Sequence, residues 1–260
     1  MIPETFIEAW KSNAPWQTLG MVEQDMVISR ALIELYSHPE ISNLLAFRGG
    51  TALNKLYIKP PSRYSEDIDF VQINAESIGK TLNAIRSKLD HWLGKPNRTL
   101  TNRSTKLTYK FESIDGSISK LKVEINTTEH FHVKKLKTVD LIMESEWFTG
   151  SSKILTYELE ELIATKLRAL YQRRKGRDLF DLWLVLKHDL INVNEVISIF
   201  EKYCVHNKQK ITKELFKENL NQKRNHRDFS VDMRTLLSLE MNWRFDEAFE
   251  LVYEKIISRL

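Results

Sequence analysis

Two short segments in the first third of the chain restrict its fold more than any other feature of the sequence. Residues 47–51 read Phe-Arg-Gly-Gly-Thr, which is typical of a strand that turns through glycine into a helix. Residues 67–71 read Asp-Ile-Asp-Phe-Val, which is typical of a strand. Because side chains alternate along a strand, Asp67 and Asp69 are expected on one face of a sheet, with the apolar residues beside them facing a core.

The chemistry of these two segments indicates a charged ligand. Two carboxylates on one face of a strand repel each other, and a divalent cation relieves that repulsion. The N–H groups exposed where a glycine turn begins a helix are suited to phosphate. A glycine pair alone is commonly only a turn, and an Asp-x-Asp alone is commonly a solvated strand edge. Their occurrence in this order, with Thr51 directly behind the glycines, favours a site for a metal-bound nucleoside triphosphate.

The composition is that of a folded protein without a membrane anchor. With 260 residues, 42% of them hydrophobic and 28% charged, the chain has room for one large domain or two closely packed ones. It has no apolar run of membrane-spanning length and no leader pattern at its start, so we expect it in the cytoplasm. Seven scattered histidines and the single Cys204 make no zinc-ligand spacing, and no P-loop motif is present.

Hydrophobic periodicity predicts a mixed N-terminal part and a helical C-terminal part. The elements expected in the first part are helices within residues 5–36, 51–57 and 76–93, and strands at 44–48, 67–73, 106–112 and 119–126. The last two strands are joined by an Asp-Gly turn, which is typical of a hairpin. In the second part, helices are expected at 157–172, 178–186, 194–203, 212–220 and 246–258.

The second strand of the hairpin carries a third candidate acid. Its residues alternate, so Leu121, Val123 and Ile125 share one face and Glu124 lies on the opposite, polar face. If this strand lies beside the acidic strand, Glu124 joins the two aspartates. The spacing alone is almost equally compatible with an ordinary exposed glutamate on a half-buried strand.

A second group of charged residues lies on the first two helices of the C-terminal part. Lys166 is flanked by apolar residues, so its ammonium needs an anionic partner, either an acid or a triphosphate. Arg173 lies two turns further along the same face, and Gly176 is expected to end this helix. Asp178 is then a candidate N-cap of the next helix, with Asp181 one turn on.

These patterns, taken in order, resemble the AbiEii/AbiGii-type toxin family of the DNA polymerase β-like nucleotidyltransferase superfamily. The resemblance covers residues 20–190, and its gap at residues 52–66 is somewhat longer than the superfamily usually shows. It implies an α+β fold with two lobes, a nucleotidyltransferase-like lobe with a mixed sheet at residues 1–150 and an all-helical lobe at residues 151–260. The matching pieces are Phe47–Leu53, Arg63–Phe70 and the block of Lys166, Arg173, Arg177, Asp178 and Asp181.

The resemblance also implies which residues form the site. Asp67, Asp69 and Glu124 would bind metal, with two Mg²⁺ ions expected and Mn²⁺ as an alternative. Lys166 and Asp178 would complete the catalytic set, and the resemblance leaves open whether Asp178 orients Lys166 or the nucleotide. The residues implied to bind the nucleoside triphosphate are Gly49, Gly50, Thr51, Ser65, Lys166, Arg177 and Asp181.

The implied function is that of a toxin in a toxin–antitoxin or phage-defence system, with an antitoxin encoded nearby. Such an enzyme adds a nucleotide to the 3′ end of tRNA, or to another RNA, and blocks translation. Nucleotidyl or phosphoryl transfer to a protein, and a non-catalytic protein that binds nucleotide or RNA, are the alternatives. A run of basic residues is more often a solvated helix face than an RNA site. The candidates for RNA contact are Lys134, Lys135, Lys137, residues 173–177, Lys208, Lys210, Lys213, Lys217, Lys223, Arg224 and Arg227.

Overall fold

The computed structural model describes residues 2–226, 229, 233–238 and 240–260, which divide into two compact units. The first, here called the sheet unit, runs to Tyr157 and also takes in Leu237 and Ser238. The second, here called the helical unit, comprises Glu158–Leu236 and Glu240–Leu260. Arg227, one of the basic residues considered for RNA contact, lies outside the described residues.

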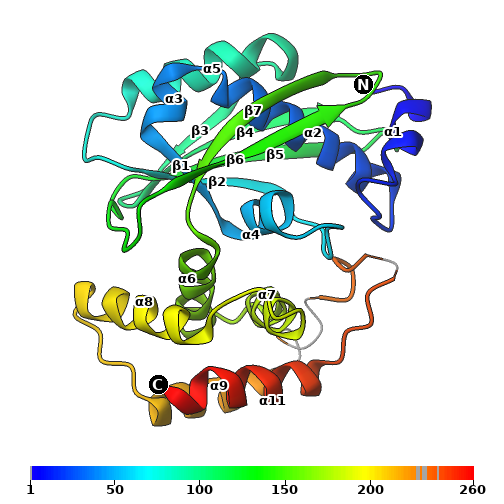
Figure 1. Cartoon of the computed structure of the whole chain (residues 1–260). Coiled ribbons are helices and arrows are strands. Elements are labelled where there is room, and N and C mark those ends of the chain that lie inside the picture. Colours follow the sequence, from blue (N-terminus) through cyan, green and yellow to red (C-terminus); the bar gives the residue numbers. More distant parts are fainter. Residues whose placement is uncertain (1, 227–228, 230–232, 239) are drawn as a thin grey trace. The chain divides into compact units, whose positions relative to one another are not determined.

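A seven-stranded mixed sheet forms the centre of the sheet unit (Figure 1). The strand order is β3-β4-β5-β2-β1-β7-β6. β2 runs parallel to β5, and β1 runs parallel to β7, while the other neighbours are antiparallel. The predicted α+β class with a mixed sheet is therefore confirmed. The strands are β1 Leu45–Arg48, β2 Asp67–Gln72, β3 Asn97–Leu100, β4 Ser104–Glu112, β5 Ile118–Asn126, β6 Lys137–Glu144 and β7 Thr149–Thr156.

Helices lie on both sides of this sheet. In Figure 1, α2, α3 and α5 lie along one side and α4 lies on the other. α4 is a short helix that continues directly into one π-helical turn, η1, so the helix predicted at residues 51–57 begins two residues earlier and is wider in its second half. The helices are α1 Glu4–Trp10, α2 Leu19–Tyr36, α3 Pro39–Leu44, α4 Gly49–Ala52, η1 Leu53–Tyr57 and α5 Gly79–Leu93.

The core of the sheet unit lies between the sheet and α2. Ile68 and Phe70 of β2 are buried, as the alternation predicts, and so are the apolar residues of β5. The ring of Phe70 packs against Tyr36 of α2 and against Phe47 of β1, with centroid distances of 5.9 and 5.8 Å. Because these residues face α2, the alternating aspartates of β2 face the α4 side of the sheet.

Two polar residues of α2 fasten it to the strands. The buried Glu23 carboxylate accepts hydrogen bonds from Ser113 Oγ at 2.7 Å and from the Ile114 N–H at 2.8 Å, which holds the turn of the β4–β5 hairpin. Gln24 Nε2 donates to a carbonyl just before β2 and to another within β5, at 3.3 and 3.1 Å. α2 therefore aligns β2 with β5.

Helices alone make up the regular structure of the described part of the helical unit, as predicted. Aromatic rings fill its core, where Phe180 and Trp183 each pack on Trp243 with a centroid distance of 5.2 Å. Cys204 is buried, as its apolar-periodic segment predicts. The helices are α6 Leu159–Gln172, α7 Gly176–Lys187, α8 Val193–His206, α9 Lys213–Arg224, α11 Phe245–Lys255 and the 3₁₀ turn η2 Ile257–Arg259. No helix in the described ranges is long and apolar enough to cross a membrane.

The junction of α6 and α7 differs from the prediction. α6 ends at Gln172, and Gly176 begins α7 instead of ending α6. The N-cap position belongs to Lys175, so the predicted capping role of Asp178 is wrong. Asp178 lies inside the first turn of α7, where its carboxylate contacts arginine and lysine side chains instead of capping the helix.

Among the elements that the structure describes, the strands β3, β6 and β7 and one helix were not predicted. All four residues of β3 are exposed, so this strand has no apolar alternation to detect. β7 begins Thr-Gly-Ser-Ser-Lys, a polar composition that is typical of a loop, and it becomes a strand through pairing with β6 and β1. The unpredicted helix is the six-residue α3, which is too short to show periodicity.

Glu23→Ala should lower the free energy of unfolding of the sheet unit by about 1–3 kcal/mol, because the Ser113 hydroxyl and the Ile114 N–H would lose their partner in a buried place. The measurement is urea unfolding followed by circular dichroism. Glu8→Ala, which removes an exposed ion pair with Lys11, is the control and should change stability little. Equal effects of the two substitutions would show that Glu23 does not hold the hairpin.

Candidate active site

The strand register places the candidate acids together on one face of the sheet. Asp69 of β2 lies opposite Glu124 of the parallel strand β5 and opposite Arg48 of the antiparallel strand β1. Residues that face each other across paired strands point to the same side of the sheet, so these three side chains form one row. Asp67 lies two residues earlier on β2, on the same face, opposite Lys122. The structure therefore brings Glu124 beside the aspartates.

Basic and hydroxyl side chains already engage the Glu124 carboxylate. Lys106 Nζ lies 2.9 Å from Glu124 Oε2, and Ser104 Oγ donates a hydrogen bond of 2.8 Å to Oε1. The hydrogen bond to Glu124 raises the pKa of Lys106, and the charges of Asp67 and Asp69 add to this effect against a smaller opposing effect of burial. Lys106 therefore stays protonated. It partly neutralises the three acids Asp67, Asp69 and Glu124, which are here called the acid row.

The acid row fits a hard divalent cation in its chemistry. Asp67 Oδ1 is buried and makes no hydrogen bond to a described residue, although Lys122 Nζ lies 3.4 Å from it as an ion-pair partner. The donors in the row are carboxylate oxygens, the ligand type that Mg²⁺ prefers. Among the described residues, no three acidic, histidine or cysteine side chains are gathered closely enough to hold a metal ion as they stand. Asp67 and Asp69 present carboxylate oxygens on one face of β2, whereas the Glu124 oxygens are already bonded to Lys106 and Ser104.

The glycine turn owes its composition to its neighbours in space. Gly49 has a φ of +84°, and a Cβ placed on it would lie 2.4 Å from Asp69 Oδ2. A Cβ on Gly50 would lie 2.2 Å from Nη2 of Arg63. Both positions therefore need glycine for close packing against charged side chains, a reason that is separate from phosphate binding. The predicted binding of phosphate by this turn stays a prediction.

Thr51 connects the turn to the acidic strand. Its side chain is only 2% exposed, and its Oγ1 donates a hydrogen bond of 2.5 Å to the carbonyl oxygen of Asp67. Ser65 Oγ lies 2.8 Å from the same Oγ1. The structure thus brings Thr51 and Ser65 into contact, and both fix the position of α4 relative to the first residue of β2.

Two arginines that were not predicted as site residues also lie at this site. Arg48, in the row with Asp69, forms an ion pair of 2.8 Å with Glu129. Burial acts to lower the pKa of Arg48. Interactions with Tyr157, Glu129 and Asp69 outweigh burial and raise the pKa. Arg63 is 1% exposed, and its Nη1 donates to the carbonyl of the next residue at 3.1 Å.

A signal for these arginines was present in the sequence but was incomplete. Arg48 is the last residue of a predicted strand, and an antiparallel pairing with the acidic strand would have placed it near an aspartate. Arg63 reads as an exposed loop residue, because nothing local shows that its guanidinium packs against a glycine 13 positions earlier.

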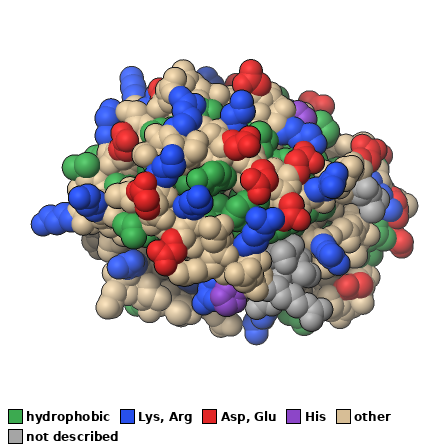
Figure 2. Space-filling view, turned by 90° about the horizontal axis from the view of Figure 1, so that it is seen from below, with side chains coloured by type: hydrophobic (Ala, Val, Ile, Leu, Met, Phe, Trp, Pro, Cys, Tyr) green, Lys and Arg blue, Asp and Glu red, His purple; other side chains and the backbone are tan. Residues whose placement is uncertain are grey.

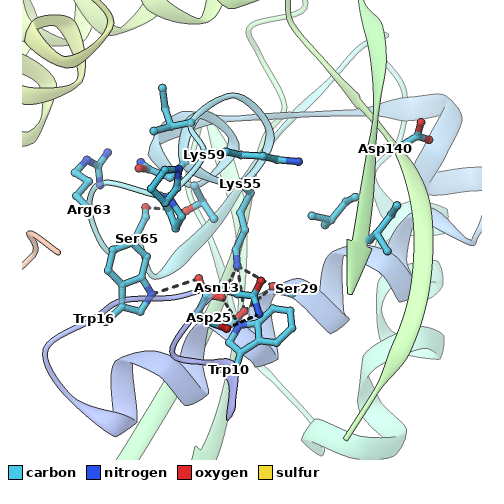
Figure 3. Close-up of a pocket in the computed structure, with 18 residues that line it drawn as sticks. Trp10, Asn13, Trp16, Asp25, Ser29, Lys55, Lys59, Arg63, Ser65 and Asp140 are labelled. Atoms are coloured by element: carbon cyan, nitrogen blue, oxygen red, sulfur yellow. Dashed lines mark hydrogen bonds and ion pairs between the residues drawn. The ribbon is translucent and has the colours of Figure 1, made fainter. Parts of the chain in front are cut away.

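A cavity of about 320 Å³ lies in the sheet unit next to Thr51 and Ser65 (Figure 3). In the close-up, Lys55 points toward Asp25 and Ser29 of α2. Lys55 Nζ forms an ion pair of 2.6 Å with Asp25 Oδ1 and a hydrogen bond of 2.7 Å with Ser29 Oγ, which anchors η1 on α2. None of the three candidate acids lines this cavity. The cavity therefore lies beside Thr51, which follows the glycine turn, and is distinct from the acid row.

The helical unit holds the second group of candidate residues in a buried ion cluster. Lys166 Nζ lies 2.9 Å from Asp181 and 3.4 Å from Asp178, and all three side chains are at most 5% exposed. Arg173 binds the Asp178 carboxylate through Nε at 2.7 Å and Nη2 at 2.9 Å. Burial acts to raise the pKa of Asp178, but Lys166 and Arg173 outweigh it and the pKa is lowered. The anionic partners that Lys166 needs are therefore acids of α7.

The candidate residues form two groups, one in each unit. The helical unit holds Lys166, Asp178 and Asp181 in direct contact, with Arg177 partly exposed at the second position of α7. The sheet unit holds Gly49, Gly50, Thr51, Ser65, Asp67, Asp69 and Glu124.

Comparison with known proteins gives one family and a set of similar folds. A family model for the nucleotidyl transferase AbiEii toxin of type IV toxin–antitoxin systems matches residues 30–251. MenT4, a nucleotidyltransferase toxin from Mycobacterium tuberculosis, is similar with a TM-score of 0.69 and 16% identity, over 100% of this chain and 91% of that one. JHP933 from Helicobacter pylori is similar with a TM-score of 0.57 and 19% identity, over 92% of each chain. Curated protein sequences give no match. At these identities the structural likeness concerns the fold.

Gly49→Ala should destabilise the sheet unit more than Gly116→Ala. Both positions have positive φ, +84° and +76°, but an added Cβ meets Asp69 at the first and nothing within 4 Å at the second. The difference in unfolding free energy should be about 1–3 kcal/mol, the usual effect of overpacking. Urea unfolding of both variants measures it. Equal unfolding free energies of the two variants would show that the Asp69 side chain can move away from residue 49 without a loss of stability.

Lys166→Met should destabilise the helical unit by about 3–5 kcal/mol, because it leaves two buried carboxylates without their ammonium partner. Adding Asp181→Asn to this variant should recover part of the loss by removing one of the two carboxylate charges that Lys166 balances. Lys175→Met, an exposed residue before α7, is the matched control. Thermal and urea unfolding are the measurements, and an undisturbed Lys166→Met variant would contradict a structural role for the cluster.

Proposed function

Because the chain belongs to the AbiEii family of nucleotidyl transferase toxins from type IV toxin–antitoxin systems, we propose that it transfers a nucleotide from a nucleoside triphosphate to the 3′ end of tRNA and thereby blocks translation. The observation that best supports this proposal is the acid row, in which Asp69 lies beside Glu124 and directly against the glycine turn. Acids brought together in this way can hold the divalent cations that neutralise phosphate charge during transfer.

We propose that Asp67 and Asp69 hold two divalent cations, Mg²⁺ or alternatively Mn²⁺. Bound cations of this kind supply Lewis acidity toward hydroxyl and phosphate oxygens. Glu124 would serve as a third ligand or as the base that takes the proton of the attacking hydroxyl. Lys106 and Lys122, which form ion pairs with Glu124 and Asp67, balance part of the negative charge of the acids.

The residues proposed to bind the triphosphate act in two ways. The backbone N–H groups of the glycine turn would bind phosphate oxygens, while Thr51 and Ser65 keep that turn against β2. Lys166 would contribute positive charge, and Asp178 and Asp181 act on it as positioning residues through their ion pairs. The set proposed for nucleotide binding remains Gly49, Gly50, Thr51, Ser65, Lys166, Arg177 and Asp181.

An RNA acceptor needs positive charge on the surface of the protein. Figure 2 shows one face of the molecule, on which basic side chains are interspersed with acidic ones. Arg224, part of the basic run, is paired with Asp246 at 2.6 Å, and Lys223 is buried. Attraction to RNA would therefore come from a few local sites instead of one continuous basic surface.

The biological setting follows from the family. Its type IV toxin–antitoxin organisation implies a cognate antitoxin. We propose that the protein acts in the cytoplasm, where tRNA and nucleoside triphosphates are both present, and that the resulting growth arrest serves phage defence.

Purified protein with Mg²⁺, total tRNA and one α-labelled nucleoside triphosphate at a time should incorporate label into tRNA, and EDTA should abolish it. Asp67→Ala and Asp69→Ala should reduce incorporation by at least about 100-fold, because each removes a metal ligand. The melting temperature of Asp67→Ala should change little, since Lys122, the ion-pair partner of Asp67, is itself half-exposed. Asp140→Ala, an exposed acid of β6, is the control.

Three other outcomes would redirect the proposal. Label that enters protein from an α-labelled nucleotide would indicate a protein acceptor. Label that enters tRNA or protein only from a γ-labelled nucleotide would indicate phosphoryl transfer. Undiminished incorporation in both aspartate variants would remove the acid row from the chemistry.

A further inference from the structure

A hollow of about 380 Å³ lies in the helical unit where α6 ends and α9 passes it. Its walls are residues 171–174, at the end of α6, and polar side chains on and just after α9. The ring of Tyr171 packs on Phe216 with a centroid distance of 5.2 Å, which fixes one wall. A hollow of this size can hold a phosphate and a sugar.

The charged groups that line the hollow are basic. Arg173, Arg174, Lys223 and His226 line it, and no aspartate or glutamate does among the residues that the structure describes. Arg173 is already bound to Asp178. Arg174 Nη1 lies 2.9 Å from a ring nitrogen of His226, and neither side chain is paired with a described acid. Within the described part of the chain, Arg174 is therefore a positive charge at the hollow without an acidic partner.

Lys223 keeps the floor of the hollow from repelling an anion. The last carbonyls of a helix carry partial negative charge, which disfavours a phosphate. Lys223 Nζ donates hydrogen bonds to two of these carbonyls at the end of α6, that of Leu170 and that of Tyr171, the second at 2.7 Å. Burial lowers the pKa of Lys223 to about 8, so its ammonium is still charged at neutral pH. The end of α6 is thereby neutralised from within the protein.

Asn219 adds a requirement that a phosphate alone does not meet. Its Oδ1 is buried and makes no hydrogen bond to any described residue, so it lacks a donor. A phosphodiester has only acceptor oxygens, whereas the ribose 2′-hydroxyl can donate as well as accept. DNA has no hydroxyl at this position.

From these contacts we propose that the hollow binds one phosphodiester of the RNA acceptor through Arg174 and the adjoining ribose 2′-hydroxyl through Asn219. This inference rests on the proposed function, since it assigns part of the surface that holds the acceptor. Arg174 supplies affinity, while Asn219 supplies the preference for RNA over DNA.

The test is fluorescence anisotropy with a labelled single-stranded RNA and the DNA of the same sequence, over a series of salt concentrations. Arg174→Ala should weaken binding of both by about five- to tenfold at 0.15 M salt and lower the slope of log K against log salt by about 1. Lys202→Ala, which removes an exposed cation of α8 outside the hollow, is the matched control. Asn219→Leu should lower the ratio of RNA to DNA affinity toward one and leave DNA binding unchanged. Melting temperatures of all variants confirm folding.

The outcomes separate this inference from the proposed function. If the wild-type protein labels tRNA but Arg174→Ala binds RNA like Lys202→Ala, the hollow is not an RNA site and the proposed transfer stands. If the wild-type protein binds no RNA, both proposals fail. If inorganic phosphate or a nucleoside triphosphate raises the melting temperature of the wild type but not of Arg174→Ala, while both proteins bind RNA equally, the hollow binds free phosphate compounds and the inference is overturned.

Discussion

The contact between Gly49 and the Asp69 carboxylate organises the sheet unit. The turn after β1 has a positive φ that glycine adopts without strain, and the missing side chain lets the carboxylate lie directly against the backbone. Thr51 then reaches the carbonyl of Asp67, so the beginning of α4 is held to the acidic strand at two points. The geometry of every other candidate residue on this face follows from that attachment, because the register of β2 positions β1 and β5 in turn.

The helical unit differs in that it buries charged side chains. Burying Lys166 or Asp178 alone would cost several kcal/mol, since a charge loses its water. Each has an opposite charge within 3.4 Å, and Arg173 brings a second positive charge from the exposed side. The cluster therefore holds one ammonium group at a defined position, which a flexible surface lysine could not provide. In contrast, Asp67 and Glu124 of the sheet unit are partly exposed, and so are their lysine partners.

Local patterns were sufficient for the elements that bury one face. The acidic strand, the β4–β5 hairpin and the helices α6, α7, α8, α9 and α11 have strong periodicity, and the structure has them within a few residues of the predicted bounds. The strands β3 and β7 could not be found in this way, because their residues are polar or exposed and their order comes from neighbouring strands. The roles of Arg63 and Lys106 could not be predicted either, because their partners are distant in the sequence.

The sequence by itself determined which residues carry charge and which face of each strand or helix they occupy, because alternation and helical period depend only on local backbone geometry. It therefore indicated the acid pair, the third acid and a lysine in need of anionic partners. Only the tertiary structure decided that Glu124 lies opposite Asp69, that Asp178 and Asp181 are the partners of Lys166, and that the glycines make room for Asp69 and Arg63. Register and burial arise from contacts between segments far apart in the chain, and no local pattern contains them.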